Sequence, residues 1–525
     1  MKERNNFKNL LCRLPGFVFF LTMITIFSIC TFLSKRCYIW DYLGASEPNI
    51  PLLLFIGVLV TTGIFFLGRK FHLDTHIVIN KKFLICAFIL SFVLQVIATY
   101  HYYFLTDWDV RTVFRLSSAI AHHEELSSFS EYFSRYPNNL VLASFFSTVI
   151  SLVHKMGFHE LEYFSLIVIQ CLLNTVAGLL VMTAIKQLFH DDFLCLIGYL
   201  FYLGLAGISP WVVVPYSDSM GLIFPVLIFN IYLYHPEKKG RFFGVLKWFS
   251  IVFLSYIGYK IKPQILILFL GILVVEIYTN FIFWDNLTSK LRQFIRIFAG
   301  MILGLLMAVF LSNAMAESTN VPLDSEQAFG PTHFLMMGIH PETHGGYNRA
   351  DVDFSLSFPT IEVRKTANLQ VARERLEAMG ISGFSEHLLQ KVLYNFNDGS
   401  FFWGGEGVFY KEVLPEKNHS VSSFFRNLYY NRETPGKYYS SWYTFTQLLW
   451  ITVLFFTIPA GLLNKEKKAM AAMTSLIGLT LFELLFEARS RYLFAYVPIY
   501  IIVAICGMKF LFNVWEKRKN KTDLS

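Results

Sequence analysis

Acidic side chains stand at the junctions between apolar and polar stretches of this chain. Asp107 and Asp109 flank Trp108 in "LTDWDVRTVFR", and Asp218 follows Tyr216 in "PYSD". Ionisable groups beside long apolar segments are costly and by default indicate function. One such carboxylate can take a proton from a hydroxyl acceptor, while another orients the acceptor or binds a divalent cation. These three acids are therefore the candidate catalytic residues.

Two clusters of basic residues stand at other junctions. They are Lys260 and Lys262 in "GYKIKPQ" and Arg489 and Arg491 in "FEARSRY". Arginine holds a phosphate through a bidentate fork, and lysine acts as a point charge. A single cation here would be explained by a side chain that reaches lipid phosphate, whereas two separate clusters favour recognition of an anion. Acids and phosphate-binding cations at a lipid boundary indicate transfer from a lipid-linked phosphate.

The stretch "SRYPNN" interrupts the apolar pattern between residues 134 and 139. Pro137 is suited to begin a helix, and asparagine can cap one. Tyr136, Asn138 and Asn139 are also candidates for polar contact with a substrate, and the two interpretations are compatible.

No motif indicates a nucleotide or metal centre. The histidines in "AHHEE" and at positions 333, 340 and 344 show no regular ligand spacing, which disfavours a metal centre built from them. P-loop, GxSxG and GxGxxG patterns do not occur, so ATP hydrolysis has no support. The metal is thus unknown and no cofactor is certain, although the acids would suit Mg²⁺ or Mn²⁺.

Composition identifies the class of protein in which these residues lie. The 525 residues are 54% hydrophobic and 16% charged, whereas average soluble proteins carry about 25% charged residues. Apolar runs of about 20 residues are long enough to span a bilayer as helices. The net charge of +8 lies largely between these runs, where it records membrane topology and predicts no nucleic-acid partner. We expect an all-α polytopic membrane protein.

Thirteen apolar segments are predicted helices. Their approximate limits are 16–34, 50–68, 83–104, 139–156, 162–186, 193–210, 219–235, 244–259, 263–284, 295–315, 441–463, 469–487 and 491–513. Basic residues near both ends of the chain and in the loops at 69–70 and 81–82 predict cytoplasmic termini. With the acids of residues 107–109 and Asp218 both outside, an even number of crossings must separate them, so one segment does not cross. We expect 139–156 to be that segment, which leaves about twelve spans.

This topology divides the chain into three parts. Residues 1–315 form a transmembrane module with an acidic outer loop at about 105–138. Residues 316–440 form a large extracellular loop domain, in which "PTIEVRKTANLQVARERLEAMG" has helical periodicity. Residues 441–525 form the C-terminal transmembrane helices and a basic cytoplasmic tail.

Several of these motifs, in this order, resemble the GT-C superfamily of membrane glycosyltransferases. The acidic loop, "YPNN", "PYSD", the Lys-Pro pair and "RSRY" carry the likeness, with "MMGIHPETHGGYNRAD" and "NDGSFFWGGEG" in the large loop. It is strongest to the protein mannosyltransferase-like branch of Gram-positive bacteria. Two features depart from the superfamily: three spans precede the acidic loop, and its acid pair is "DWD" and not "DE". The second weakens the expectation of a protein acceptor.

The resemblance implies a GT-C-like bundle and an inverting transfer of sugar from a polyprenyl-phosphate carrier. The acceptor is a cell-wall polysaccharide, a teichoic acid or a protein, and transfer occurs outside the plasma membrane of a bacterium. Asp109 is preferred to Asp107 as the general base, Asp218 matches a second acidic position, and the four cations match carrier-phosphate contacts. The alternatives are a lipid-linked sugar transporter (a flippase), whose site would lie near the bilayer midplane, and a polysaccharide polymerase.

Overall fold

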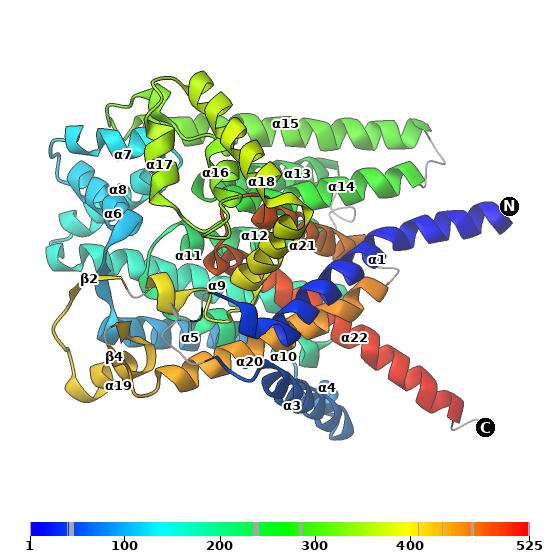
Figure 1. Cartoon of the computed structure of the whole chain (residues 1–525). Coiled ribbons are helices and arrows are strands. Elements are labelled where there is room, and N and C mark those ends of the chain that lie inside the picture. Colours follow the sequence, from blue (N-terminus) through cyan, green and yellow to red (C-terminus); the bar gives the residue numbers. More distant parts are fainter. Residues whose placement is uncertain are drawn as a thin grey trace.

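The chain folds into a bundle of long helices, with shorter helices and strands gathered at the end opposite the two termini (Figure 1). The structure is a computed structural model that describes residues 2–38, 40, 47–234, 241–282, 287–407, 409–432, 434–463 and 467–522. The first elements are α1 (Lys2–Phe32), α3 (Ile50–Lys70), α4 (Leu73–His76), α5 (Lys81–Tyr102), β1 (Phe104–Thr106), α6 (Trp108–Ala121), α7 (Ser130–Arg135), α8 (Asn139–Lys155) and α9 (Glu162–Phe189).

The remaining elements follow in two groups. The first is α10 (Asp192–Tyr202), α11 (Ser217–Gly221), α12 (Ile223–Leu233), α13 (Arg241–Ile261), α14 (Leu266–Ile282), α15 (Leu287–Glu317), α16 (Pro331–Gly338), α17 (Arg349–Leu356) and α18 (Ile361–Phe396). The second is β2 (Tyr410–Val413), α19 (His419–Tyr429), β3 (Asn431–Arg432), β4 (Thr434–Pro435), α20 (Tyr439–Thr457), α21 (Lys467–Leu485) and α22 (Val497–Thr522).

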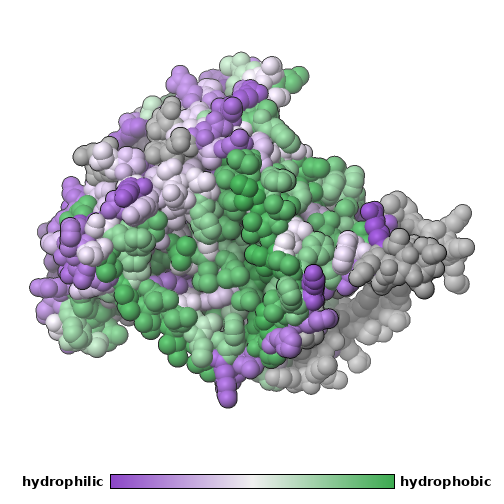
Figure 2. Space-filling view, turned by 90° about the horizontal axis from the view of Figure 1, so that it is seen from below, coloured by the Kyte–Doolittle hydropathy of each residue, from purple (hydrophilic) through white to green (hydrophobic). Residues whose placement is uncertain are grey.

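Helices of membrane-spanning length dominate the described part of the chain. Ten of them are long and apolar enough to cross a bilayer, and three apolar segments, Asn139–Lys155, Asp192–Gly207 and Ser217–Leu233, are shorter. Large apolar side chains of α3, α5 and α15 are exposed. Figure 2 shows hydrophobic residues covering the middle of one face of the molecule. A surface of this kind suits contact with lipid. The prediction of a polytopic helical membrane protein is confirmed in this form, while twelve crossings remain a prediction.

Helix α8 is the segment that we expect not to cross. It has 17 residues. At its start, Asn139 donates from Nδ2 to the Tyr132 hydroxyl over 3.0 Å, and in its last turn the ring of His154 lies 4.4 Å from that of His122. Tyr132 and His122 both belong to the polar stretch between α5 and α8. Both ends of α8 thus contact one polar stretch, which supports the expectation.

Ion pairs tie helix ends together toward the termini. Arg69, near the end of α3, pairs with Asp191, and Lys509 of α22 lies 3.4 Å from the same carboxylate. Lys186 of α9 lies 2.9 Å from Asp192. Because α22 runs on from Lys509 to the C-terminal end, these helix ends lie on the side of the bundle that carries the termini.

The region 316–440 contains most of the remaining polar chain. The predicted helix over "PTIEVRKTANLQVARERLEAMG" is confirmed as α18, whose first turn is capped by the Thr360 side chain, which accepts from the Val363 amide over 3.5 Å. Gly380 has a φ of 58° and breaks the helix. In the part that follows, Gln390 donates to the carbonyl of Arg36, just after α1, and Asn395 donates to the carbonyl of Glu483 in α21, so this region is docked on the membrane helices.

A short antiparallel pairing joins the acidic loop to the large polar region. In strand β1, Phe104 pairs with Val413 of β2, and Thr106 pairs with Tyr410 across a local irregularity in register. The Asp107 amide then donates to the Phe409 carbonyl over 2.9 Å. This pairing fixes the backbone immediately before Trp108 and Asp109.

Candidate active site

A cluster of buried ion pairs forms where four separate segments of the chain meet. Asp218 pairs with Lys262, and its other oxygen lies 3.6 Å from Nη1 of Arg491. Glu406 pairs with Arg489, and its second oxygen lies 2.9 Å from Nε of Arg491. The side chains of these five residues are at most 12% exposed. We call these five residues the charged cluster. It lies at the end of the bundle away from the C-terminus, because α22 runs from there to the C-terminal end.

Breaks in the helices place these charges. Helix α13 ends at Ile261 because the next residue, Lys262, precedes Pro263, and a residue before proline is disfavoured in the helical conformation. Lys262 is accordingly extended, with φ −148° and ψ 117°. Arg489 is also extended (φ −161°, ψ 132°) and begins the 3₁₀ turn Ser490–Tyr496 that leads into α22. Each cation therefore stands at a junction, as the sequence indicates.

Trp108 connects the acidic loop to the charged cluster through contacts of its ring. Its φ is 54°, a left-handed conformation that is strained for a bulky residue and concentrates at functional sites. The ring lies edge-on to Tyr216, with 5.2 Å between ring centroids, and the Arg491 guanidinium lies 4.4 Å from its centroid. Tyr216 in turn donates from its hydroxyl to Asp109 over 3.4 Å.

The structure separates the two acids of "DWD". Asp109 faces the charged cluster through Tyr216. The Asp107 side chain is 51% exposed, and its carboxylate lies 3.7 Å from Arg111, one turn further along α6. Of the two candidates, Asp109 is therefore the one that lies at the cluster.

The residues of "YPNN" lie at the start of α8, next to the acidic loop. Asn138 is the residue before α8, but its side chain makes no capping hydrogen bond and donates instead to Asn139 over 3.3 Å. The Tyr136 ring lies 5.2 Å from the Tyr132 ring. Burial raises the pKa of the Tyr136 hydroxyl, and the charge of Asp109 adds to the effect. Tyr136 thus lies near Asp109, and the contact of Tyr136, Asn138 and Asn139 with a substrate stays a prediction. The asparagine at the start of α8, Asn138, does not cap it through its side chain.

Lys260 is not brought into the cluster within the described residues. Its Nζ lies 5.6 Å from the centroid of the Tyr256 ring, one turn back on α13. Lys262, which lies beyond the end of the helix, pairs with Asp218 instead. The structure thus brings Lys262 to the cluster, and contact of either lysine with a phosphate stays a prediction.

Sequence reasoning missed two other buried charges. Glu406 lies in the π-helical turn Trp403–Gly407 and pairs with both arginines. Lys391 of α18 donates to the carbonyls of Gly338 (2.8 Å) and Phe486 (2.6 Å). A lone glutamate in the glycine-rich run "WGGEG" was the only available signal for Glu406, and nothing in the sequence marked Lys391.

Two groups beside the cluster titrate near neutral pH. Burial raises the pKa of the Glu487 carboxyl to about 7, against the charge of Arg491. Burial lowers the pKa of the Lys391 ammonium to about 7, against the charges of Glu483 and Glu487. Glu487 also lies 2.9 Å from Nε of Arg489. The net charge around the cluster therefore changes across the neutral range.

Several buried polar atoms of the site carry no hydrogen bond from the described part of the chain. They are Nε1 of Trp108, Nε and Nη1 of Arg491, and one oxygen of Asp218. Buried donors without partners are costly. Nε of Arg491 is ion-paired with Glu406, and its Nη1 lies 3.6 Å from Asp218. The indole N–H of Trp108 is the donor that suits an oxygen atom of a ligand.

A cavity of about 420 Å³ adjoins the acidic loop. Arg111, Arg115 and Lys411 line it together with one acid, Glu412, and the aromatic rings of Phe114 and Tyr163. Its cationic and aromatic lining suits an anion that carries rings or apolar faces.

The acids of the charged cluster do not form a metal site in the residues described. Among the residues that the structure describes, the group of three His, Cys, Asp or Glu side chains close enough to share an ion is His122, His154 and Glu162. The suggested Mg²⁺ or Mn²⁺ at Asp109 or Asp218 stays a prediction.

The fold and the charged cluster define a polytopic helical membrane protein with buried ion pairs at one end of its bundle. A family model described as "conserved hypothetical integral membrane protein" matches residues 12–510, and the chain belongs to that family. No curated protein matches the chain. The family places the protein in the membrane, and the likeness to GT-C glycosyltransferases is carried forward below as a proposal.

Proposed function

We propose that the protein is a GT-C type glycosyltransferase that moves a sugar from a polyprenyl-phosphate-linked donor to an extracytoplasmic acceptor. One observation carries the proposal: Asp109 reaches, through Tyr216, the same buried cluster that holds Lys262 and Arg491. A base and phosphate-binding cations side by side at one end of a membrane bundle are what such a transfer requires.

The donor phosphate binds at Arg491 and its neighbours. A phosphate would accept from the Arg491 guanidinium in competition with the carboxylates of Glu406 and Asp218, which lie 2.9 Å from its Nε and 3.6 Å from its Nη1. Arg489 and Lys262 add positive charge in a buried setting where electrostatic attraction is strong. As the glycosidic bond breaks, these cations stabilise the charge that develops on the departing phosphate.

Asp109 acts as the general base. It takes a proton from the acceptor hydroxyl, whose oxygen then attacks the anomeric carbon while the lipid phosphate leaves from the opposite face. One displacement of this kind inverts the anomeric configuration. Asp218, the second acid, holds Lys262 and Arg491 in position through its ion pairs.

The orientation follows from charge. Basic residues at the helix ends near the termini, Arg69, Lys186 and Lys509, belong inside by the positive-inside rule. The charged cluster and the region 316–440 then face outward from the bacterial plasma membrane. The docked outer region excludes water, which would otherwise hydrolyse the donor.

The cavity beside the acidic loop is the acceptor site in this proposal. Its three cations, Arg111, Arg115 and Lys411, outnumber its one acid, Glu412, and so fit a polyanion better than a neutral glycan. An anionic cell-wall polymer, such as a teichoic acid, is therefore the preferred acceptor, with a protein second.

The test is sugar transfer by the full-length protein in liposomes that contain a polyprenyl-phosphate sugar and an anionic acceptor. We expect Asp109→Asn to lower turnover by about 100-fold or more, the usual range for loss of a general base. The matched variant Asp107→Asn changes the exposed acid directly before Trp108, and we expect it to retain turnover within a few-fold. Full activity of a folded Asp109→Asn protein would overturn the assignment.

A transporter of lipid-linked sugars is the second candidate. The segment between α10 and α12 is broken by a π-helical turn, Leu203–Gly207, and a 3₁₀ turn, Pro210–Val213, before it reaches Asp218. Discontinuous helices of this kind bind substrates in transporters. Movement of a labelled donor between leaflets without chemical change would favour this candidate. For the other alternative, a polysaccharide polymerase, the length of the product separates repeated addition from a single transfer.

A further inference from the structure

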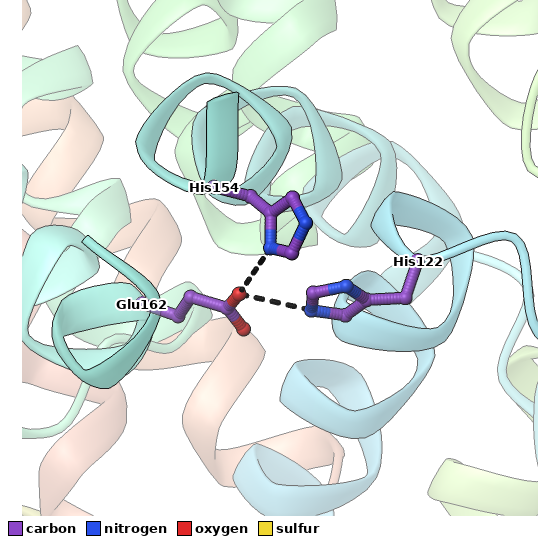
Figure 3. A group of neighbouring side chains, drawn as sticks. All are labelled: His122, His154 and Glu162. Atoms are coloured by element: carbon purple, nitrogen blue, oxygen red, sulfur yellow. Dashed lines mark hydrogen bonds and ion pairs between the residues drawn. The ribbon is translucent and has the colours of Figure 1, made fainter. Parts of the chain in front are cut away.

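Three side chains from separate segments converge at the far end of α6 from Asp109 (Figure 3). His122 directly follows α6, His154 lies in the last turn of α8, and Glu162 begins α9. Nε2 of His122 lies 2.9 Å from Oε1 of Glu162, and Nδ1 of His154 lies 3.4 Å from the same oxygen. One atom from each residue lies within 4.8 Å of the others.

These spacings fit the first coordination sphere of a transition metal. Ligand atoms about 2.0–2.1 Å from a tetrahedral Zn²⁺ are roughly 3.3 Å from one another, and the two measured distances lie on either side of that value. Two imidazoles and one carboxylate favour a transition metal such as Zn²⁺ over Mg²⁺ and Ca²⁺, which prefer oxygen ligands alone.

Burial and the surroundings are also suitable. The Glu162 side chain is 11% exposed, whereas those of His122 and His154 are 25% and 40% exposed, so solvent ions can enter. His159 adjoins the group, with its Nδ1 2.8 Å from Nδ1 of His154. Because Nδ1 of His154 is the atom that faces Glu162, binding of a metal there replaces its hydrogen bond with His159.

We propose that His122, His154 and Glu162 bind one Zn²⁺. The fourth position is open to water. The ion links the end of α6 to α8 and α9. Loops separate these three helices from one another in the sequence.

The metal positions helices and does not take part in the chemistry of the charged cluster. Helix α6 has 14 residues, which corresponds to about 20 Å at 1.5 Å per residue. Since Asp109 lies in its first turn and His122 follows its last, the ion is too distant to touch groups bound at Asp109. The inference is thus independent of the proposed sugar transfer.

The experiment measures binding of Zn²⁺ to the full-length protein in detergent after EDTA treatment, by calorimetry with ZnCl₂. We expect one ion per chain, and Co²⁺ in place of Zn²⁺ should give the visible absorption of a tetrahedral site. His122→Asn and Glu162→Gln each weaken Zn²⁺ binding at least 100-fold. His159→Ala weakens it less.

The matched control is His123→Asn, the same change at the neighbouring residue. His123 is exposed and has a φ of 59°, a conformation that asparagine tolerates, and binding should match that of the unaltered protein. Each variant is compared with the metal-free unaltered protein by size exclusion and thermal unfolding, and His154→Gln, at the most exposed ligand, serves if His122→Asn does not fold. Absence of stoichiometric binding, or equal binding by the ligand variants, would mean that the three residues form hydrogen bonds only and would overturn the site.

Discussion

The guanidinium of Arg491 lies 4.4 Å from the centre of the Trp108 ring. Trp108 stands between the two acids of "DWD", and Arg491 belongs to the "RSRY" motif near the C-terminus. The contact therefore joins these two motifs. A desolvated cation–π contact of this kind contributes about 2 kcal/mol. It explains why a tryptophan with strained backbone stands between the two acids: its ring supports the cation while its neighbour Asp109 faces the same space.

Trp108→Phe and Trp108→Ala separate the roles of this ring. Phenylalanine keeps an aromatic face for Arg491, and alanine does not. We expect the alanine variant to bind a polyprenyl-phosphate sugar about 10-fold or more weakly, in line with the loss of such a contact, and the phenylalanine variant to lose less. Equal affinities of the two variants would show that the ring face does not support the anion site.

The buried pair of Lys262 and Asp218 should behave non-additively. Removal of one partner leaves an uncompensated buried charge, so Lys262→Met or Asp218→Asn should each lower the free energy of unfolding by about 3–5 kcal/mol. The double variant should lose less than the sum, because neither charge is then left alone. Thermal unfolding in detergent measures this, and strictly additive losses would contradict the pairing.

Anion binding should weaken as pH rises through about 7. Below that pH Glu487 is neutral and Lys391 is charged; above it Glu487 gains a negative charge and Lys391 loses its positive one. Both changes disfavour an anion. Affinity for a lipid phosphodiester, which does not itself titrate there, should therefore fall between pH 6 and pH 8.

Glu487→Gln should flatten this pH dependence, since the glutamine stays neutral throughout. Lys260→Ala, which alters a cation outside the cluster, should leave the profile unchanged. A pH profile in Glu487→Gln that is as steep as in the unaltered protein would exclude Glu487 as its source.

The cavity beside the acidic loop should govern use of the acceptor. Arg115→Ala should raise KM for an anionic acceptor polymer about 10-fold, as expected for one lost charge-assisted hydrogen bond, and leave donor affinity unchanged. Arg349→Ala is the control, since Arg349 is an exposed arginine paired with Asp353 on α17. Weakened donor binding in Arg115→Ala would place the cavity on the donor path instead.

Helix α8 should have both ends outside the membrane. Cysteines at the exposed positions Asn138 and Lys155 should react with an impermeant maleimide on intact cells, and one at exposed Lys70 should react only after permeabilisation. The unaltered protein gives the background from its own cysteines. Reaction of Lys155→Cys from the cytoplasmic side alone would mean that α8 crosses.

The sequence predicted the helices and much of the site because both leave local signals. Apolar runs mark helices wherever they are long, and charged residues at their ends, such as Asp218, Lys262 and Arg491, stand out against them. Three apolar segments are too short to count as crossings by length alone, so their number stayed open. Length in sequence does not say how far a broken helix reaches into a bilayer.

What could not be predicted depends on distant parts of the chain. Lys391 and Glu406 look like ordinary residues of a polar helix and a glycine-rich loop until the fold brings them beside the arginines. The group of His122, His154 and Glu162 has no motif, because each ligand comes from a different segment. Which of Lys260 and Lys262 reaches the charged cluster depends on where α13 ends, and Pro263 determines that end.

The pairing of β1 with β2 has a consequence for biosynthesis. Residues 104–106 leave the ribosome early, whereas their partners at 410–413 are made only after most of the membrane helices. Until then the backbone before Asp109 lacks its neighbouring strand, and Arg489 and Arg491 have not been synthesised. A nascent chain can therefore insert most of its helices while the charged cluster is still incomplete, so that the site is assembled only near the end of translation.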